Sequence, residues 1–194
     1  DGRDSSTRQS WNIRYIKRFY EQRCISFRAV LEGIPYQRAY EIFRHEGPLA
    51  LLPLRNNIYQ VIWFSKDQET NSKLKHSDSE LLKRLSTILP DKIKPKMIVS
   101  EIANYSVAQA FALPKFNEFN KILVGDSAHS FHPVGGQGLN SCIRDVYELS
   151  NMILHYDNLS LTSRKLFSLK FFLNRFIDII SLLIFTDFLI KLFS

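Results

Sequence analysis

The stretch from Ile122 to Asn140 constrains the fold more than any other part of the sequence. The apolar run Ile122 to Val124 ends in the pair Gly125-Asp126, and Pro133 precedes three glycines that fall between positions 135 and 138. Apolar residues then recur at spacings of three and four, which predicts a helix with one apolar face. We therefore expect a strand, an acidic turn, a glycine loop and a helix, in that order. The apolar positions of the expected helix are Leu139, Ile143, Val146, Leu149 and Ile153.

This order of elements suits a large cofactor with polar edges. The Asp126 carboxylate can accept hydrogen bonds from sugar-like hydroxyls, and the glycines let the backbone approach a ligand closely. The N-terminus of the expected helix offers unpaired N–H groups and a partial positive charge to an electron-rich group. A glycine-rich loop by itself is equally typical of a surface turn, so the neighbouring residues have to decide between the two interpretations.

The complete string resembles the second flavin-binding motif of the single-component flavoprotein aromatic hydroxylases, the family typified by p-hydroxybenzoate hydroxylase. That motif is Gly-Asp, small-small-His, Pro, Gly-Gln-Gly-x-Asn and then Asp-x-x-x-Leu, which stands here as Asp145 to Leu149. The resemblance implies that Asp126 binds the ribityl hydroxyls of FAD, and that the backbone from Gly136 to Asn140 faces the pyrimidine edge of the isoalloxazine. Two residues depart from the pattern: Ser127 replaces the usual Ala, and Cys142 replaces the usual Gly.

Other segments carry the same resemblance. The segment Asp1 to Arg8 resembles the family's Asp-Gly motif, Asp-Gly-x-x-Ser-x-x-Arg, which in relatives lies by the FAD pyrophosphate and is implicated in pyridine-nucleotide binding. Taken alone, it would be typical of a turn or a disordered terminus. The segments Gly47 to Leu54 and Phe185 to Ser194 resemble the ubiquinone-biosynthesis hydroxylases within the family. The cofactor-binding residues that the resemblance implies are Asp1, Gly125, Asp126, Pro133, Gly135, Gly136, Gln137, Gly138, Leu139 and Asn140.

One expected motif does not occur in these 194 residues. The dinucleotide fingerprint Gly-x-Gly-x-x-Gly, with an acidic residue roughly 20 positions later, lies before the Asp-Gly motif in this family. We therefore expect the chain to be the C-terminal portion of a longer enzyme, as a fragment, a split-gene product or a degraded reading frame. In the second case the missing N-terminal half would be a separate chain and a partner of this one.

Composition excludes several other functions. The net charge of +7 favours anionic surfaces, but the basic residues are dispersed, with no block of about five or more like charges, so no nucleic-acid partner is expected. Cys24 and Cys142 have no metal-ligand spacing and favour a reducing compartment, and no metal site is expected. The sequence has no secretory signal, and the expected location is cytoplasmic, with a peripheral position on the inner face of the membrane as the alternative.

The expected fold class is α/β (α+β): the C-terminal part of a Rossmann-like FAD domain, a mostly antiparallel β substrate domain and C-terminal helices. Residues 1–20 would hold the Asp-Gly motif and the return to the FAD domain, and residues 21–115 the substrate domain with one helix. Residues 116–160 would hold the Gly-Asp motif with its strand and helix, and residues 161–194 the apolar C-terminal helices.

Alternating apolar residues and turn signals predict the strands of the substrate domain. The sequence Ser77 to Glu80 is a capping box, which predicts a helix from there to Leu89. The expected extended segments are Cys24 to Gly33, Tyr36 to Arg44, Leu49 to Leu54, Ile58 to Phe64 and Met97 to Phe111.

The end of the chain is rich in Phe, Leu and Ile from Leu166 to Ser194, but charged residues interrupt it. Its longest uncharged run, Ile179 to Thr186, has eight residues, whereas a membrane-spanning helix needs about 20 apolar residues. Two interpretations remain open. The segment forms a pair of core helices packed on the flavin domain, or it forms an interfacial helix that touches the membrane where a polyprenylated substrate resides.

The resemblance implies an FAD-dependent monooxygenase of ubiquinone biosynthesis that uses NAD(P)H and O₂ to hydroxylate a polyprenyl-phenol ring. Its implied partners are this polyprenylated phenol and either the membrane surface or a quinone-biosynthesis complex. The flavin carries the chemistry, so no catalytic side chain is assigned, and His129 and His132 are expected to be structural. Two alternatives stay open: an inactive remnant or split-gene subunit without flavin, and an FAD hydroxylase of another aromatic substrate.

Overall fold

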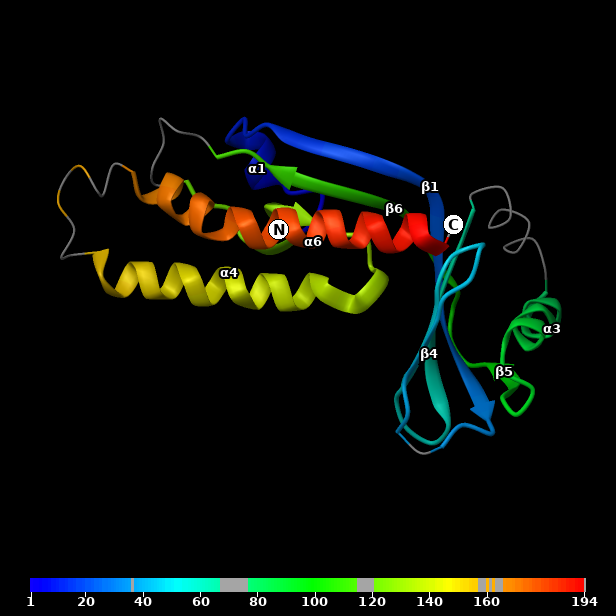
Figure 1. The fold of residues 1–194 in the computed structure, drawn as a ribbon. Helices are drawn as coiled ribbons and strands as arrows, with labels where there is room; N and C mark the ends of the chain where they lie inside the picture. The colour runs from blue at the N-terminus through cyan, green and yellow to red at the C-terminus, as the bar shows by residue number, and fades with distance from the viewer. Residues whose placement is uncertain are drawn as a thin grey trace. The chain divides into compact units, whose positions relative to one another are not determined.

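The computed structural model describes residues 1–35, 37–66, 77–114, 121–156, 160, 162 and 166–193 (Figure 1). The chain divides into two compact units, and each is described by itself. Unit 1 comprises Asp1–Phe19 and Ala108–Leu189, and unit 2 comprises Tyr20–Val107 and Ile190–Ser194. The mixture of helices with an antiparallel sheet confirms the expected α/β class.

The strands follow one another in the order β2-β3-β4-β1-β6-β7, and β5 pairs with β1 outside this order. Register pairs such as Ser26 with Ile62 and Leu51 with Val61 make β1–β4 and β3–β4 antiparallel, and β2–β3, β1–β5 and β6–β7 are antiparallel as well. The strands are β1 (Tyr15–Glu32), β2 (Tyr40–Ile42), β3 (Leu49–Pro53), β4 (Ile58–Lys66), β5 (Lys94–Ile98), β6 (Ala103–Ala112) and β7 (His129–Ser130).

The core of unit 2 forms where one face of this sheet meets helix α3 (Asp78–Ile88). Because side chains alternate between the two faces of a strand, every second residue of β1 from Ile25 to Leu31 is buried. Leu81 and Leu85 of α3 pack into the same core. The Glu80 carboxylate accepts the Ser77 backbone N–H at 3.0 Å, so the predicted capping box starts this helix as expected.

Unit 1 is built around two helices, α4 (Gln137–Leu154) and α6 (Phe167–Phe193), which lie side by side in Figure 1. Polar contacts join them at several levels, among them Arg144 to Asp178 at 3.1 Å and Asn174 to Glu148 at 2.6 Å. The other described elements that lie wholly within this unit are short. They are α1 (Ser6–Ser10), the 3-10 turns η1 (Gly125–Ser127) and η2 (Val134–Gly136), and strand β7.

Several expected elements differ in extent from the observed ones. Strand β1 begins at Tyr15 instead of Cys24, and the segment expected from Met97 to Phe111 is two strands, β5 and β6. Within the expected segment Tyr36 to Arg44, the described residues contain only the short strand β2. Tyr36 itself lies outside the described residues. Of the two interpretations left open for the end of the chain, a pair of core helices or an interfacial helix, the described residues from Phe167 onward form one continuous helix, α6. None of the helices in the described part of the chain combines the length and the apolar character that a membrane span requires.

The expected strand from Ile122 to Val124 is wrong for the part of the chain described. Val124 has an extended backbone, with φ −133° and ψ 155°, but residues 121–124 form no ladder with any described strand. A strand exists only where its backbone N–H and C=O groups pair with a neighbour. The segment is therefore extended without being part of the sheet.

The apolar face that the sequence predicts for α4 is present, but most of it is exposed. Leu139 is 71% exposed, Ile143 58% and Ile153 57%. The fully buried residues of this helix are instead Ser141 and Asp145. The apolar face of α4 therefore points away from α6, because the polar face makes the contacts described below.

Gly33, directly after β1, provides a test of the sheet geometry. Its φ is +81°, and a Cβ added there would lie 1.7 Å from the backbone oxygen of Lys92. We predict that Gly33→Ala destabilises unit 2 by about 3 kcal/mol or more, since both the backbone conformation and the space favour glycine. Urea unfolding followed by fluorescence of the buried Trp63 measures this. Gly2→Ala is the control, because nothing lies within 4 Å of an added Cβ there, and equal midpoints for both variants would contradict the prediction.

Candidate functional site

The Gly125-Asp126 pair forms the turn η1 at the side of α4. Gly125 has φ +60°, and an added Cβ would lie 3.1 Å from the Cys142 Sγ, so the left-handed backbone and the close helix both favour glycine here. Asp126 is exposed, and among the described residues its carboxylate has no hydrogen-bond partner. The turn thus presents an unused acceptor group at the surface of unit 1.

Arg8 joins the two predicted motifs. Its side chain is buried, and its guanidinium donates from Nη1 to the Ser127 carbonyl at 2.8 Å and from Nη2 to the Arg3 carbonyl at 2.7 Å. The guanidinium carbon lies 3.6 Å from the centre of the Tyr15 ring. Burial raises the pKa of the Tyr15 hydroxyl, and the Arg8 charge opposes that rise. The N-terminal Asp-Gly segment and the Gly-Asp turn therefore belong to one site.

Asp1 serves the first helix. Its carboxylate accepts the Ser5 hydroxyl at 2.9 Å and the Thr7 backbone N–H at 3.1 Å. The second bond satisfies a backbone donor in the first turn of α1 that no helical carbonyl can reach, and the first holds the side chain of the N-cap residue Ser5. The structure thus gives Asp1 a capping role, and its predicted contact with a cofactor stays a prediction.

The glycine loop has free space at the positions from which side chains would project. Gly135 and Gly136 have φ +78° and +61°, and a Cβ added at either of them, or at Gly138, would meet nothing within 4 Å. Gly136 is the N-cap of α4 and lacks a side chain that could cap the helix. The loop therefore leaves backbone N–H groups of the first turn of α4 available to a ligand.

The other predicted residues lie at the same end of α4. Pro133 is exposed just before η2, and Leu139 and Asn140 are exposed in the first turns of the helix. The Gln137 side chain donates to the Gly135 carbonyl at 3.1 Å and accepts from Asn140 at 3.3 Å. An exposed carboxylate on η1, an unobstructed glycine loop and a free helix N-terminus fit a cofactor with hydroxyl groups and an electron-rich polar edge.

A buried ionic cluster centred on Asp145 holds this end of the unit together. Its carboxylate accepts the Gly125 backbone N–H at 2.8 Å, lies 2.6 Å from the His129 Nε2, and accepts the Arg175 Nε at 2.8 Å. Arg175 in turn contacts Asp178 at 2.6 Å. Asp145 is 1% exposed and Arg175 is 6% exposed. Arg175 was not predicted from the sequence, where the one indication of its role was a single arginine within the apolar C-terminal segment.

The charges in this cluster stabilise each other. Burial alone would raise the pKa of the Asp145 carboxyl, but the hydrogen bonds from His129, Arg175 and Gly125 hold it below its usual value. Burial likewise works against the charge of Arg175, but the bonds to Asp145 and Asp178 raise its pKa. Both groups are therefore charged across the physiological pH range. Each one provides the opposite charge and the hydrogen bonds that offset the cost of burying the other.

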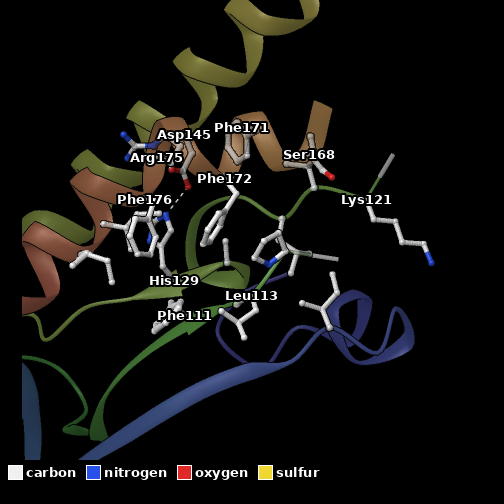
Figure 2. A pocket seen from close by; sticks show the side chains of 18 residues that line it. Phe111, Leu113, Lys121, His129, Asp145, Ser168, Phe171, Phe172, Arg175 and Phe176 are labelled. Atoms are coloured by element: carbon white, nitrogen blue, oxygen red, sulfur yellow. Dashed lines mark hydrogen bonds and ion pairs between the residues drawn. The ribbon is translucent and has the colours of Figure 1, made fainter. Parts of the chain in front are cut away.

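An apolar pocket lies beside the cluster (Figure 2). Its cavity volume is about 60 Å³, and the phenyl rings of Phe111, Phe172 and Phe176 line it together with His129, Asp145 and Arg175. None of the predicted cofactor-binding residues lines this pocket. Its apolar walls give the ionic cluster a low-dielectric environment on this side, which strengthens the cluster's interactions.

The two histidines of the motif loop are both buried. His129 bonds Asp145 as described, and its ring centre lies 5.0 Å from that of Phe131. His132 accepts the Val134 backbone N–H on Nδ1 at 3.1 Å, and burial lowers its pKa to about 4. Within the described residues, no group of three or more His, Cys, Asp or Glu side chains could hold a metal ion. His76 lies outside the described residues.

Comparison with known proteins agrees with this geometry. The family described as FAD binding domain matches residues 1–157. The 3-demethoxyubiquinol 3-hydroxylase of Escherichia coli is 28% identical over 160 residues, which cover 80% of this chain and 39% of that protein. The ubiquinone hydroxylase UbiL of Rhodospirillum rubrum is 30% identical over 199 residues, covering 100% of this chain and 45% of that protein. The chain thus spans less than half of the length of these relatives.

The fold is also similar to solved structures. PqsL of Pseudomonas aeruginosa, described as a probable FAD-dependent monooxygenase, superposes with a TM-score of 0.79 at 17% identity, over 100% of this chain and 54% of that one. The anhydrotetracycline hydroxylase OxyS of Streptomyces rimosus superposes with a TM-score of 0.69 at 18% identity, over 100% of this chain and 38% of that one. At these identities the likeness concerns the fold.

Burial of neutral His132 predicts how stability depends on pH. The unfolded chain takes up a proton at this side chain near its ordinary pKa of 6.5, whereas the folded chain takes it up near 4. The contribution of neutral His132 to the free energy of unfolding is therefore fully present above pH 6.5. It falls by about 3 kcal/mol in total as the pH drops toward 4. We predict that His132→Asn flattens this part of the curve, measured by urea unfolding between these pH values. The exposed His155 provides the control variant His155→Gln, and parallel curves for the wild type and His132→Asn would contradict the prediction.

Proposed function

Because the chain belongs to the FAD binding domain family, we propose that it supplies the flavin-facing half of the FAD site of a ubiquinone-biosynthesis monooxygenase. The intact enzyme would hydroxylate the ring of a polyprenyl phenol with NAD(P)H and O₂. The names of the relatives from Escherichia coli and Rhodospirillum rubrum support this substrate class. The observation that carries the proposal is the unpaired Asp126 carboxylate beside an open glycine loop at the start of α4.

Different residues of the turn and loop would contact different parts of FAD. Asp126 would accept hydrogen bonds from the ribityl hydroxyls, and the backbone from Gly136 to Asn140 would face the pyrimidine edge of the ring system. The N-terminus of α4 would stabilise negative charge on that edge. Bound FAD supplies the redox chemistry between NAD(P)H, O₂ and the phenol. The protein then has to orient the two rings and exclude water, which needs no acid–base side chain from the buried histidines.

The exposed apolar face of α4 fits a partner polypeptide. Leu139, Ile143, Val146 and Ile153 are each more than half exposed, and monomeric proteins rarely expose apolar patches of this extent without a binding role. We assign this face to the polypeptide that corresponds to the remainder of the relatives' length, either as the preceding part of one chain or as a separate one. That polypeptide would bring the dinucleotide fingerprint and the pyrophosphate contacts.

Titration with FAD tests the role of Asp126. We predict that Asp126→Ala weakens FAD binding by about tenfold to a hundredfold, because charge-assisted hydrogen bonds to the ribityl chain are lost. Flavin fluorescence measures the binding to this chain combined with the polypeptide encoded immediately upstream. The matched control is Asp91→Ala, which removes an exposed carboxylate of unit 2. Equal losses in both variants would argue against the assignment.

Complementation separates the substrate alternatives. In strains that each lack one quinone hydroxylase, the combined polypeptides should restore the quinone. Flavin binding without restored quinone would favour the hydroxylase of another aromatic substrate. If no flavin is retained either, the chain is an inactive remnant or a subunit that works without flavin.

The outer face of α6 supports a second partner, an anionic membrane surface. Leu173, Ile177, Ile184 and Phe188 are each more than half exposed on this face, and Lys170 is exposed near its start. Both aspartates of the helix are in ion pairs: Asp178 with Arg144 and Arg175, and Asp187 with Arg18 at 3.1 Å. An apolar face with a lysine at its start favours a helix that lies on anionic lipid, on the cytoplasmic side where the polyprenyl substrate would be embedded.

Vesicle binding tests this surface. We predict that Ile177→Glu weakens binding to vesicles of phosphatidylcholine and phosphatidylglycerol by about tenfold, because it places a charge in the apolar contact. Co-sedimentation measures the binding. The control Ile143→Glu makes the same change on the exposed face of α4 and should leave vesicle binding intact. The membrane assignment fails if the wild-type chain does not sediment with these vesicles or if both variants lose binding equally.

A further inference from the structure

We infer that Arg175 of α6 is a positioning residue for Asp126, and that it acts through Asp145 and Gly125. The inference rests on the proposed function in one respect, namely that Asp126 faces the cofactor. The matched family domain ends at residue 157, so it does not include α6. The connection from this helix through Asp145 to the turn η1 thus gives α6 a role at the candidate site.

The chain of contacts is short and buried. The Arg175 Nε donates to Asp145 Oδ1 at 2.8 Å, and the other carboxylate oxygen, Oδ2, accepts the Gly125 N–H at 2.8 Å. Asp126 is the next residue after Gly125, in the same 3-10 turn. The two oxygens of one carboxylate therefore connect the guanidinium on α6 to the backbone of the turn. Rotation of that carboxylate would break the bond to Gly125.

Asp145 cannot keep this orientation by itself. The side chain is 1% exposed, and a buried carboxylate without a cation is strongly disfavoured. His129 contacts the same oxygen as Gly125 does, at 2.6 Å, and leaves the opposite oxygen to Arg175. Arg175 is thus the one described residue with a hydrogen bond to Oδ1, and it fixes the plane of the carboxylate.

Arg175 is itself held in place from several sides. Its Nη2 contacts Asp178 at 2.6 Å, and the same nitrogen lies 3.4 Å from the Ser141 hydroxyl on α4. Asp178 also forms an ion pair with Arg144 of α4 at 3.1 Å. The guanidinium therefore cannot turn away from Asp145 without breaking a second ion pair. On the far side of the turn, Arg8 holds the Ser127 carbonyl at 2.8 Å, so Asp126 stands between two fixed residues.

Hydrogen exchange of the Gly125 amide tests this coupling without flavin. We expect Arg175→Met to speed exchange at Gly125 by about tenfold, as the loss of one buried hydrogen bond would. Arg175→Lys should give a smaller increase, because a lysine can still place a charge beside Oδ1 but cannot bridge to Asp178 in the same geometry. Amides of β4 in unit 2 should not change, which separates a local effect from general destabilisation.

The matched control is Arg18→Met, which removes another arginine–aspartate pair from α6, at Asp187, without touching Asp145. If Arg175→Met does not fold, Arg175→Lys and Asp178→Asn decide by the same measurement. Unchanged exchange at Gly125 in the folded variants, or an equal increase in Arg18→Met, would overturn the inference. In the FAD-loaded protein, Arg175→Lys should also weaken FAD binding. If the wild type binds no flavin, the proposed function fails while the exchange result still decides the role of Arg175.

Discussion

The buried carboxylate of Asp145 is the constraint on which the rest of unit 1 depends. Its two oxygens bind the backbone of turn η1 at Gly125, the His129 side chain of the motif loop and the Arg175 side chain of helix α6. Although the carboxylate is only 1% exposed, these partners together hold its pKa below the usual value. The turn, the loop and the two long helices are therefore arranged around one side chain, with an apolar pocket beside it.

This constraint also explains which face of α4 is buried. With Ser141 and Asp145 turned toward α6, the apolar residues of α4 have to point to the opposite side, where they are exposed. A helix normally buries its apolar face, and this exposure supports the proposal that another polypeptide covers α4. The glycine loop lies at the N-terminal end of the same helix, so the proposed polypeptide would also complete the site.

Much of unit 2 could be predicted from the sequence because its signals are local. The capping box at Ser77 and the alternation along Ile25 to Leu31 involve neighbours in the chain, and the corresponding helix and strand were found. Periodicity predicted the apolar face of α4 but not which face is buried, because the partners of Asp145 lie 20 residues before it and 30 residues after it. Periodicity alone cannot show such contacts.

The candidate site shows the same division. Its glycines and Asp126 were recognisable from the motif, since close backbone approach and an exposed acceptor require particular residue types at fixed spacing. Arg8 was visible as the last residue of the Asp-Gly motif, but its contact to Ser127 across 119 residues was not. Arg175 carried no motif, and it acquires its role from the fold that brings α6 beside α4.

Flavin is proposed to bind against the turn and loop at the start of α4. The backbone amide chemical shifts of the isotope-labelled chain, combined with the polypeptide proposed to complete the site, test this during titration with FAD. The shift changes that appear with FAD should be concentrated between Gly125 and Asn140, with little change in β3 and β4. Changes confined to other parts of the chain, or none at a saturating FAD concentration, would contradict it.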